Sequence, residues 1–230
     1  MNKPVEKSKR ILETLQSNVN SFRALLNTVS DELTKQNIRR AIILFSCSGI
    51  DAVVKQLIID TLELVIERDE GAQEQLRVFT ERRLKKTLID QDYSILSRLF
   101  TVKNSRKLLI NMLKKELSYD SLQSSDQLFR VAAAFNIMTD RLVTGDEKKN
   151  LKKAFDIRNK IIHQMDVDFE QRDMEYFTHD DSEVEEIFMT IESVAMHFID
   201  EVGLILKKEV TVEYLPPVSI EGETLIFRDF

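Results

Sequence analysis

The chain has few of the residues that interrupt helices. Of its 230 residues, five are glycine and three are proline, about a third of the usual combined share of these two residues. The prolines lie at positions 4, 216 and 217, so residues 5–215 contain none. All-β folds need turn residues roughly every 8–12 positions. The scarcity therefore argues against an all-β fold and favours a chain dominated by long helices.

The five glycines are also too far apart to form a phosphate-binding loop. They occupy positions 49, 71, 145, 203 and 222, and no two of them have the spacing of a G-x-G or Walker-type motif. Nucleotide binding through a glycine-rich loop is thereby nearly excluded.

Cysteine and long apolar runs are scarce as well. The single cysteine, Cys47, allows no internal disulfide, which fits a reducing cytoplasm. The start of the chain lacks the apolar core of a signal peptide, and no uninterrupted apolar run is long enough to span a membrane. We therefore expect a cytoplasmic globular protein without a membrane partner, folded as one large domain or two small ones.

The net charge of −6 conceals an asymmetry along the chain. Residues 164–230 hold 18 acidic and four basic residues, and residues 1–163 hold the remaining 21 acidic and 29 basic residues. The basic residues cluster at 82–86, 103–115 and 148–160. A polyanion could bind such a surface despite the overall acidity, although each basic run also fits an ordinary solvated helix face.

Apolar residues recur at the helical period over most of the chain. The predicted helices cover residues 5–29, 37–67, 72–88, 93–100, 105–117, 128–135, 147–164 and 184–208. The second of these is apolar around most of its circumference, which predicts a central position. Capping boxes are predicted at Ser124 and Ser182, just before the helices that follow them.

Two segments do not follow the helical pattern. Residues 165–181 are acidic and without a clear period, which is typical of an ordered loop or a mobile flap. Residues 209–230 alternate polar and apolar side chains around Pro216 and Pro217. This alternation predicts a β-hairpin-like C-terminal tail, separate from an all-α domain over residues 1–208.

One charged residue interrupts the apolar face of the helix predicted over residues 147–164. Arg158 lies near the middle of the apolar arc, where a guanidinium is costly unless it is paired or borders a wet cleft or a partner. Asp51 interrupts the stripe of the second long helix in the same way and is the expected partner of Arg158. Asn159 and His163 share a neighbouring face at positions i and i+4.

These residue types suit phosphate chemistry. Arginine binds a phosphodiester and stabilises developing negative charge, and histidine takes or gives a proton near neutral pH. The 2′-hydroxyl of RNA is a built-in nucleophile, so an arginine and a histidine could cleave RNA without a metal ion or a cofactor. Two copies of the chain related by a two-fold axis would supply a base and an acid together.

Residues 158–163, with the sequence RNKIIH, resemble the R-x4-6-H motif of the HEPN superfamily in its four-residue spacing. The setting is similar too, with two long N-terminal helices, the motif on a later helix and a closing helix. Asp51 resembles the acidic position on the second helix of several HEPN subfamilies, of which the RiboL-PSP and MAE-like groups are nearest. The resemblance covers residues 5–66 and 147–208, and it makes residues 68–146 an insertion or additional helices.

The resemblance implies a metal-independent endoribonuclease that acts as a homodimer in toxin–antitoxin, abortive-infection or anti-phage systems. Its partners would be RNA and a cognate antitoxin or neighbouring defence protein. In this chain Arg158 would bind and polarise the phosphate, His163 would be the general acid and base, and Asn159 would orient them. Asp51 would support these residues without touching the substrate.

The basic cluster on the same helix supplies the candidate RNA contacts Lys152, Lys153 and Lys160. One position departs from part of the family: Met165 stands where HEPN toxins silenced by tyrosine modification carry tyrosine. Control by that modification is therefore not expected here.

Plainer interpretations fit the same residues. Asp51 and Arg158 could form a static ion pair, with His163 a surface histidine, in a non-catalytic helical scaffold or regulatory protein. His179 and the neighbouring acids have no recognised metal-ligand spacing and are expected in a solvated acidic loop. His197 is expected on the surface, and Cys47 is expected to be a buried small hydrophobic residue.

Overall fold

The computed structural model describes residues 4–91, 93–119, 122, 124–167 and 176–208. Within these residues the chain is almost entirely helical, which confirms the all-α fold class. The helices are α1 (Glu6–Leu26), α2 (Glu32–Arg68), α3 (Glu70–Asp90), α4 (Ser94–Thr101), α5 (Ser105–Ser118), α6 (Ser125–Ala134), α7 (Thr139–Leu142), α8 (Gly145–Gln164) and α9 (Asp181–Lys207). The hairpin-like tail predicted over residues 209–230 lies outside the described residues.

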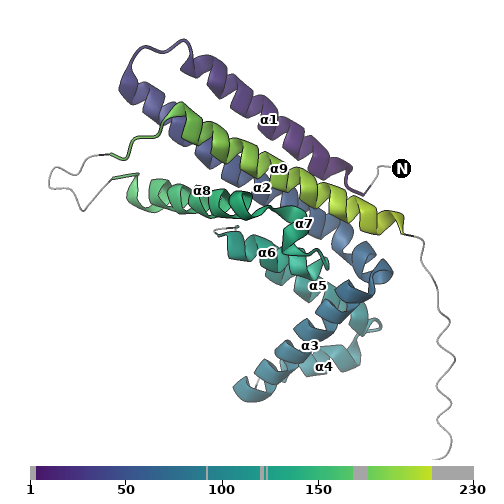
Figure 1. The fold of residues 1–230 in the computed structure, drawn as a ribbon. Coiled ribbons are helices and arrows are strands. Elements are labelled where there is room, and N and C mark those ends of the chain that lie inside the picture. Colours follow the sequence, from purple (N-terminus) through teal and green to yellow (C-terminus); the bar gives the residue numbers. More distant parts are fainter. Residues whose placement is uncertain (1–3, 92, 120–121, 123, 168–175, 209–230) are drawn as a thin grey trace, which may run out of the picture.

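Helix α2 is the centre of the fold, as its apolar circumference predicts. It packs along α1 and α9 over much of its length and also contacts α8, α5 and α3. In Figure 1, α1, α2, α9 and α8 lie side by side as an elongated bundle, with α5, α6 and α7 beneath its right-hand part. The residues expected as an insertion, 68–146, therefore fold as α3 to α7 against one side and one end of this bundle.

The length and composition of α2 would also allow it to cross a membrane, but half of its apolar stretch is buried among the other helices. The buried side chains run along the helix from Ile38 to Ile66. A core helix of a bundle and a membrane span meet the same criterion of length and hydropathy. The packing of α1, α8 and α9 against α2 accounts for the buried half of this stretch.

Side-chain caps explain where several helices begin. Asp31 accepts a hydrogen bond from the Thr34 N–H, so α2 starts several residues before the predicted position 37. Asp69 ends α2 and caps α3, in the expected break at residues 69–71. The start of α9 differs from the prediction, because Asp180 rather than Ser182 accepts the N–H of Glu183. The short helix α7 carries too few residues to show a period and was not predicted.

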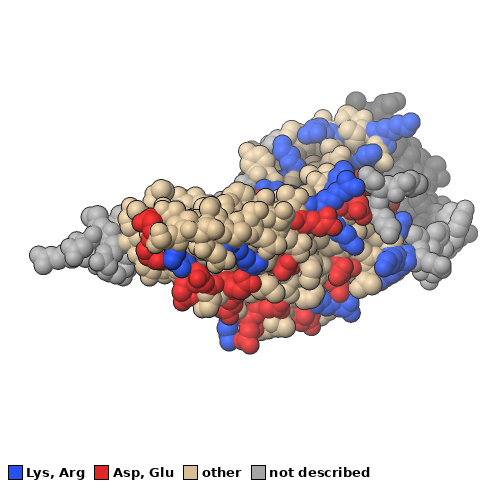
Figure 2. All heavy atoms as spheres, turned by 90° about the horizontal axis from the view of Figure 1, so that it is seen from above, with Lys and Arg blue, Asp and Glu red and all other residues tan. Residues whose placement is uncertain are grey.

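Charge is unevenly distributed over the bundle surface. Residues 14–30, which cover most of α1 and the turn after it, contain a single charged side chain, Arg23. Exposed acids follow the outer face of α9 and include Asp181, Glu185, Glu186 and Asp200. Figure 2 looks down on the bundle and shows a broad uncharged surface with acidic side chains gathered along one edge. Part of the acidic excess of the C-terminal segment is therefore carried by α9.

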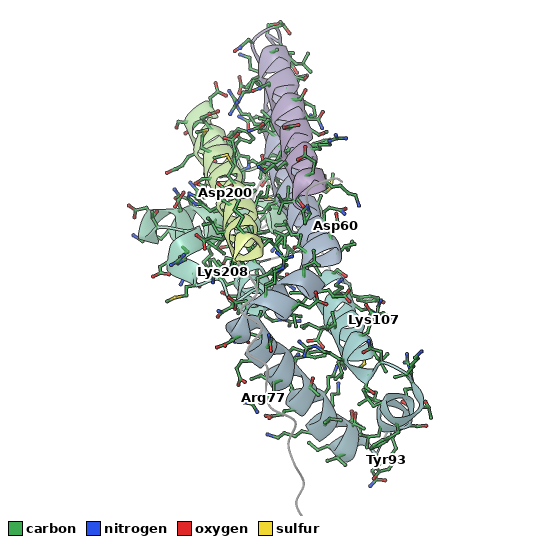
Figure 3. All side chains as sticks on the ribbon, turned by 90° about the vertical axis from the view of Figure 1, so that its right-hand side faces the viewer. Asp60, Arg77, Tyr93, Lys107, Asp200 and Lys208 are labelled. Carbon is green, nitrogen blue, oxygen red and sulfur yellow. The ribbon has the colours of Figure 1, made fainter. Side chains whose placement is uncertain are left out.

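Helices α3, α4 and α5 form an arm that extends from one end of the bundle (Figures 1 and 3). Glu116 on α5 forms ion pairs with Arg82 and Arg83 of α3 and with Arg130 of α6. These contacts tie the base of the arm together. Figure 3 shows Tyr93 at the far end of the arm. The arm also leaves large apolar side chains exposed, among them Ile89, Phe100 and Tyr119.

A close approach of α1 to α2 depends on Gly49. A Cβ atom at this position would lie 2.4 Å from Leu15 Cδ2 and 2.9 Å from its Cγ, well inside van der Waals contact. Leu15 is buried, so its side chain would have to leave its packed position to make way for the added atom. The small residue therefore sets the distance between the two helices.

Gly49→Ala should destabilise the fold, because the added methyl group would displace Leu15 from its packed position. Overpacking of a core costs roughly 1–3 kcal/mol, and the preference of a helix for alanine over glycine offsets about 1 kcal/mol of this. We therefore expect a net loss of up to about 2 kcal/mol in the free energy of unfolding. Urea titration followed by circular dichroism measures it.

Gly203 on α9 provides the matched control, because a Cβ there would meet nothing within 4 Å. Alanine is favoured over glycine inside a helix by about 1 kcal/mol, so Gly203→Ala should leave stability unchanged or raise it. Equal stabilities of the two variants would contradict the close approach at Gly49.

Candidate functional site

The RNKIIH stretch forms the last turns of α8. This helix begins at a full capping box, in which Thr144 and Glu147 each bond the other's backbone. It ends at Met165, whose φ of 52° is left-handed, and Asp166 follows with a φ of 61°. The two positive φ angles turn the chain sharply away from the helix axis. His163 thus lies in the final turn, and Arg158 lies more than one turn before it.

Arg158 is half-buried against α2, as its place in the apolar arc predicts. Its Nη1 donates a hydrogen bond to Asn159 Oδ1 at 2.8 Å. Cys47 of α2 lies close by, and burial raises the pKa of its thiol to about 12 although the charge of Arg158 acts in the opposite direction. The prediction that Cys47 is a buried small residue is confirmed, and its thiol stays protonated at neutral pH.

The expected ion pair between Asp51 and Arg158 is wrong. Asp51 Oδ2 instead pairs with Lys55 Nζ at 3.0 Å, and its Oδ1 accepts the backbone N–H of Leu122 at 2.9 Å. Helices α2 and α8 run antiparallel, with Cys47 Sγ 3.8 Å from the Ala154 carbonyl oxygen. Asp51 lies one turn beyond Cys47 on α2, in the direction that leads away from Arg158. The helical wheel predicts correctly that Asp51 lies on the face of α2 that meets α8, but it cannot predict how the two helices are aligned along their length.

His163 is exposed, and none of the described residues hydrogen-bonds to its ring. It lies five positions after Arg158, which corresponds to a difference in direction of about 140° around the helix. Asn159 is half-buried between them. The two side chains expected to share one phosphate therefore diverge within a single copy of the chain.

The three candidate RNA contacts meet at one pocket. This pocket, the α8–α9 pocket, has a volume of about 490 Å³ and lies between one face of α8 and the segment that leads into α9. Its lining comprises Lys149, Lys152, Lys153, Asp156, Ile157 and Lys160 of α8, with Asp166, Phe177, Thr178, His179 and Glu183 opposite. Neither Arg158 nor His163 lines it.

The lysines of the α8–α9 pocket differ in how they are engaged. Lys153 Nζ pairs with Glu183 at 2.8 Å. Lys160 Nζ lies 4.4 Å from the centre of the Phe177 ring, in a cation–π contact. Lys152 is exposed and contacts no charged partner among the described residues. Much of the positive charge of this wall is therefore available to an anion.

A largely buried network of polar and charged side chains forms the other wall, and the sequence pattern did not predict it. Asp166 is 1% exposed, and its Oδ2 accepts from Arg40 Nε at 2.7 Å and lies 2.9 Å from His179 Nε2. His179 Nδ1 lies 2.8 Å from Glu183 Oε2. Arg40, Asp166, His179, Glu183 and Lys153 thus form one chain of polar contacts from α2 to α8.

Asp166 and His179 were expected in a solvated acidic loop, and that expectation is wrong for both. The chain reversal after α8 turns Asp166 inward, where the Phe177 N–H donates to its backbone oxygen at 2.9 Å. Arg40 could have been found from the sequence, because it lies seven residues before Cys47 on the stripe of α2 that Asp51 also interrupts. A cation on that stripe needs a buried partner.

His179 is positioned for structure rather than for proton transfer. A carboxylate oxygen lies within hydrogen-bond distance of each ring nitrogen, so neither nitrogen is free to act on a substrate. His197, in contrast, is exposed as predicted, with Nδ1 3.1 Å from the Leu142 carbonyl oxygen. Among the described residues, no group of three histidine, cysteine or acidic side chains has the arrangement of a metal site.

Comparisons of the chain with protein-family models, with curated proteins and with solved structures found no match.

The pKa values of Glu183 and Lys153 are shifted by their contact. Burial opposes the charged form of Glu183, but hydrogen bonds from Lys153 and His179 outweigh this effect and lower its pKa. The same hydrogen bond raises the pKa of Lys153. The pair is therefore charged throughout the range between the two pKa values.

Glu183→Gln should lower stability near neutral pH but not in acid. The pKa of Glu183 is lower in the folded than in the unfolded protein, so its contribution is present above its ordinary pKa of 4.5 and is lost as the pH falls below it. We expect a loss of roughly 0.5–1 kcal/mol at neutral pH, because the pair is partly exposed. Urea unfolding at neutral and at acidic pH measures this difference.

Glu13→Gln removes an exposed carboxylate of α1 and serves as the control. Its free energy of unfolding should match the wild type at both pH values. A destabilisation by Glu183→Gln that grows as the solution is acidified would contradict the role assigned to this carboxylate.

Proposed function

We propose that the chain is a metal-independent endoribonuclease of HEPN type that cleaves RNA by attack of the 2′-hydroxyl. The observation that supports this most is the end of α8, where an exposed histidine follows a half-buried arginine bonded to asparagine. A lysine-lined pocket occupies the same helix. The motif thus lies beside a surface that attracts phosphate, as a ribonuclease requires.

In this mechanism His163 of one copy takes the proton of the 2′-hydroxyl, whose oxygen attacks the adjacent phosphorus. His163 of a second copy gives a proton to the departing 5′-oxygen, and a cyclic 2′,3′-phosphate and a 5′-hydroxyl result. Arg158 stabilises the charge on the phosphate in the transition state, and the hydrogen bond from Arg158 holds Asn159 beside it. Lys152, Lys153 and Lys160 bind the flanking backbone.

The divergence of Arg158 and His163 favours a homodimer. Side chains that point about 140° apart meet at one phosphate more readily when a second copy supplies one of them. The side of α2 between its contacts with α1 and α8 offers a surface for that copy. It carries an exposed, uncharged stripe at helical spacing that comprises Phe45, Ser48, Ala52 and Ile59.

A toxin or an effector of abortive infection or anti-phage defence, acting in the cytoplasm, fits this activity. An uncontrolled ribonuclease would damage its own cell, so the proposal includes a restraining antitoxin or a neighbouring defence protein as partner. Asp51 is left with a supporting role only, since Lys55 and the backbone of residue 122 occupy its oxygens.

The exposed apolar side chains of the arm formed by α3, α4 and α5 favour a second candidate function, that of a non-catalytic scaffold. Ile89, Phe100 and Tyr119 are each more than three-quarters exposed there. Large exposed apolar side chains on one part of a molecule occur at protein–protein contact sites. A scaffold would use this surface and would need no acid or base.

Purified protein should cleave RNA in the presence of EDTA, because no metal ion takes part in the mechanism. His163→Ala should reduce the rate by about 10²–10⁴-fold, the usual contribution of a general acid or base. Arg158→Ala should reduce it by about 10²–10³-fold through lost charge stabilisation. Gel electrophoresis of an end-labelled RNA measures the rate.

His197→Ala is the matched control, because it removes an exposed histidine on α9 far along the chain from the motif. It should retain wild-type activity. No cleavage by the wild type, or full cleavage after His163→Ala, would refute the catalytic proposal and favour the scaffold.

The protein should be a dimer at micromolar concentration, since the composite site needs two copies. Light scattering coupled to size-exclusion chromatography should give twice the mass of one chain. Phe45→Glu would place a charge on the uncharged stripe of α2 and should shift the mass toward that of a monomer, with a parallel loss of cleavage. A wild-type protein that is monomeric yet cleaves RNA would contradict the composite site.

A further inference from the structure

The α8–α9 pocket has two chemically different walls. One wall is the lysine face of α8, and the other is the buried network around Asp166 and His179. Phe177 and Ile157 add apolar surface between them. Pockets that bind small molecules commonly measure about 300–1,000 Å³ and combine apolar lining with a few polar groups, and this pocket, at about 490 Å³, falls within that range.

The lysines of the pocket that are not in ion pairs outnumber its unpaired carboxylates, so the pocket carries a net positive charge. Lys153 is paired with Glu183, and Asp166 with Arg40. Lys149 has only a weak, exposed contact with Asp146 at 3.4 Å. Lys149, Lys152 and Lys160 then face a single further carboxylate, that of Asp156. This balance fits one phosphate group held on the lysine wall.

The opposite wall offers an unused hydrogen-bond acceptor. Both Arg40 and His179 approach Oδ2 of Asp166, and its Oδ1 is buried with no donor among the described residues. A buried carboxylate oxygen without a donor is costly. Because Asp166 lines the pocket, a turn of its carboxylate toward the pocket would let a hydroxyl or amino donor of a ligand satisfy this oxygen.

We propose that the α8–α9 pocket binds a nucleoside monophosphate unit, with its phosphate on Lys152 and Lys160 and a sugar or base donor directed to Asp166. The unit is either a free mononucleotide or one nucleotide of an RNA chain, because both present the same groups. In the second case the pocket is a subsite next to the proposed cleavage site. The subsite then rests on the proposed function, but binding itself needs no cleavage.

Isothermal titration of the full chain with adenosine 5′-monophosphate, uridine 5′-monophosphate and inorganic phosphate tests the free-ligand form. A labelled short RNA with 2′-O-methyl sugars tests the chain form, because it lacks the nucleophile and cannot be cut. Since neither probe reports cleavage, a failure of the ribonuclease proposal leaves these measurements interpretable.

The double variant Lys152→Gln/Lys160→Gln should weaken binding of the nucleotide or of the RNA by at least about 10-fold, the loss expected for two charge-assisted contacts. Lys148→Gln, on the same helix but outside the pocket lining, should stay within about twofold of the wild type. Both lysines of the double variant are exposed, so folding should be unaffected, and circular dichroism checks this.

The results distinguish a free mononucleotide from a nucleotide of an RNA chain as the ligand of the pocket. Tight mononucleotide binding that depends on the two lysines assigns the pocket to a free nucleotide, and binding of the RNA alone assigns it to a chain nucleotide. If inorganic phosphate binds as tightly as both nucleotides, the sugar and base add nothing to binding, and the proposed contact of the nucleoside with Asp166 is overturned. No binding of any probe, or an equal loss with Lys148→Gln, would overturn the site altogether.

Discussion

The antiparallel packing of α8 against α2 is the constraint on which the candidate site depends. Two contacts fix it, one between Cys47 and the Ala154 backbone and the other between Arg40 and Asp166. The first is a weak hydrogen bond from a thiol to a carbonyl oxygen in the middle of α8, and the second is a buried ion pair just beyond the end of the helix. A shift of α8 by one turn would separate Arg40 from Asp166 and break this buried ion pair, which is strongly unfavourable. The position of the RNKIIH stretch is therefore set by the core.

The same packing explains which parts could be predicted from the sequence. Helical periodicity is a local property, so the scarcity of glycine and proline made the long helices and the burial of Arg158 predictable. Register between helices depends on contacts far apart in the chain, so the separation of Asp51 from Arg158 could not be derived from either helix alone. The i,i+4 pair of Asp51 with Lys55, in contrast, is local to α2. Asp166 escaped prediction because an acidic composition suggests solvent, whereas two left-handed residues in succession turn this carboxylate inward.

His163, in the last turn of α8, and His179, just before α9, illustrate how the surroundings of a histidine determine its chemistry. His179 has the buried, charged surroundings often associated with catalysis, yet both nitrogens are committed to carboxylates. His163 has no such surroundings and keeps both nitrogens accessible. A general acid or base must exchange protons with the substrate within hydrogen-bond distance. Accessibility therefore favours His163, and the buried network is better understood as the support that holds the turn in place.

The geometry of α8 also bears on how an RNA strand would reach the motif. Lys149, Lys153 and Lys160 lie on nearly one line along the helix, close to the direction of His163, whereas Arg158 points to the α2 side. A strand bound along the lysines would thus arrive at the histidine first and would meet the arginine only around the side of the helix. Within one copy the strand would have to bend sharply to contact both. In a two-fold assembly with the uncharged stripe of α2 at the seam, a strand could run from the lysine wall of one copy to the arginine of the other without that bend.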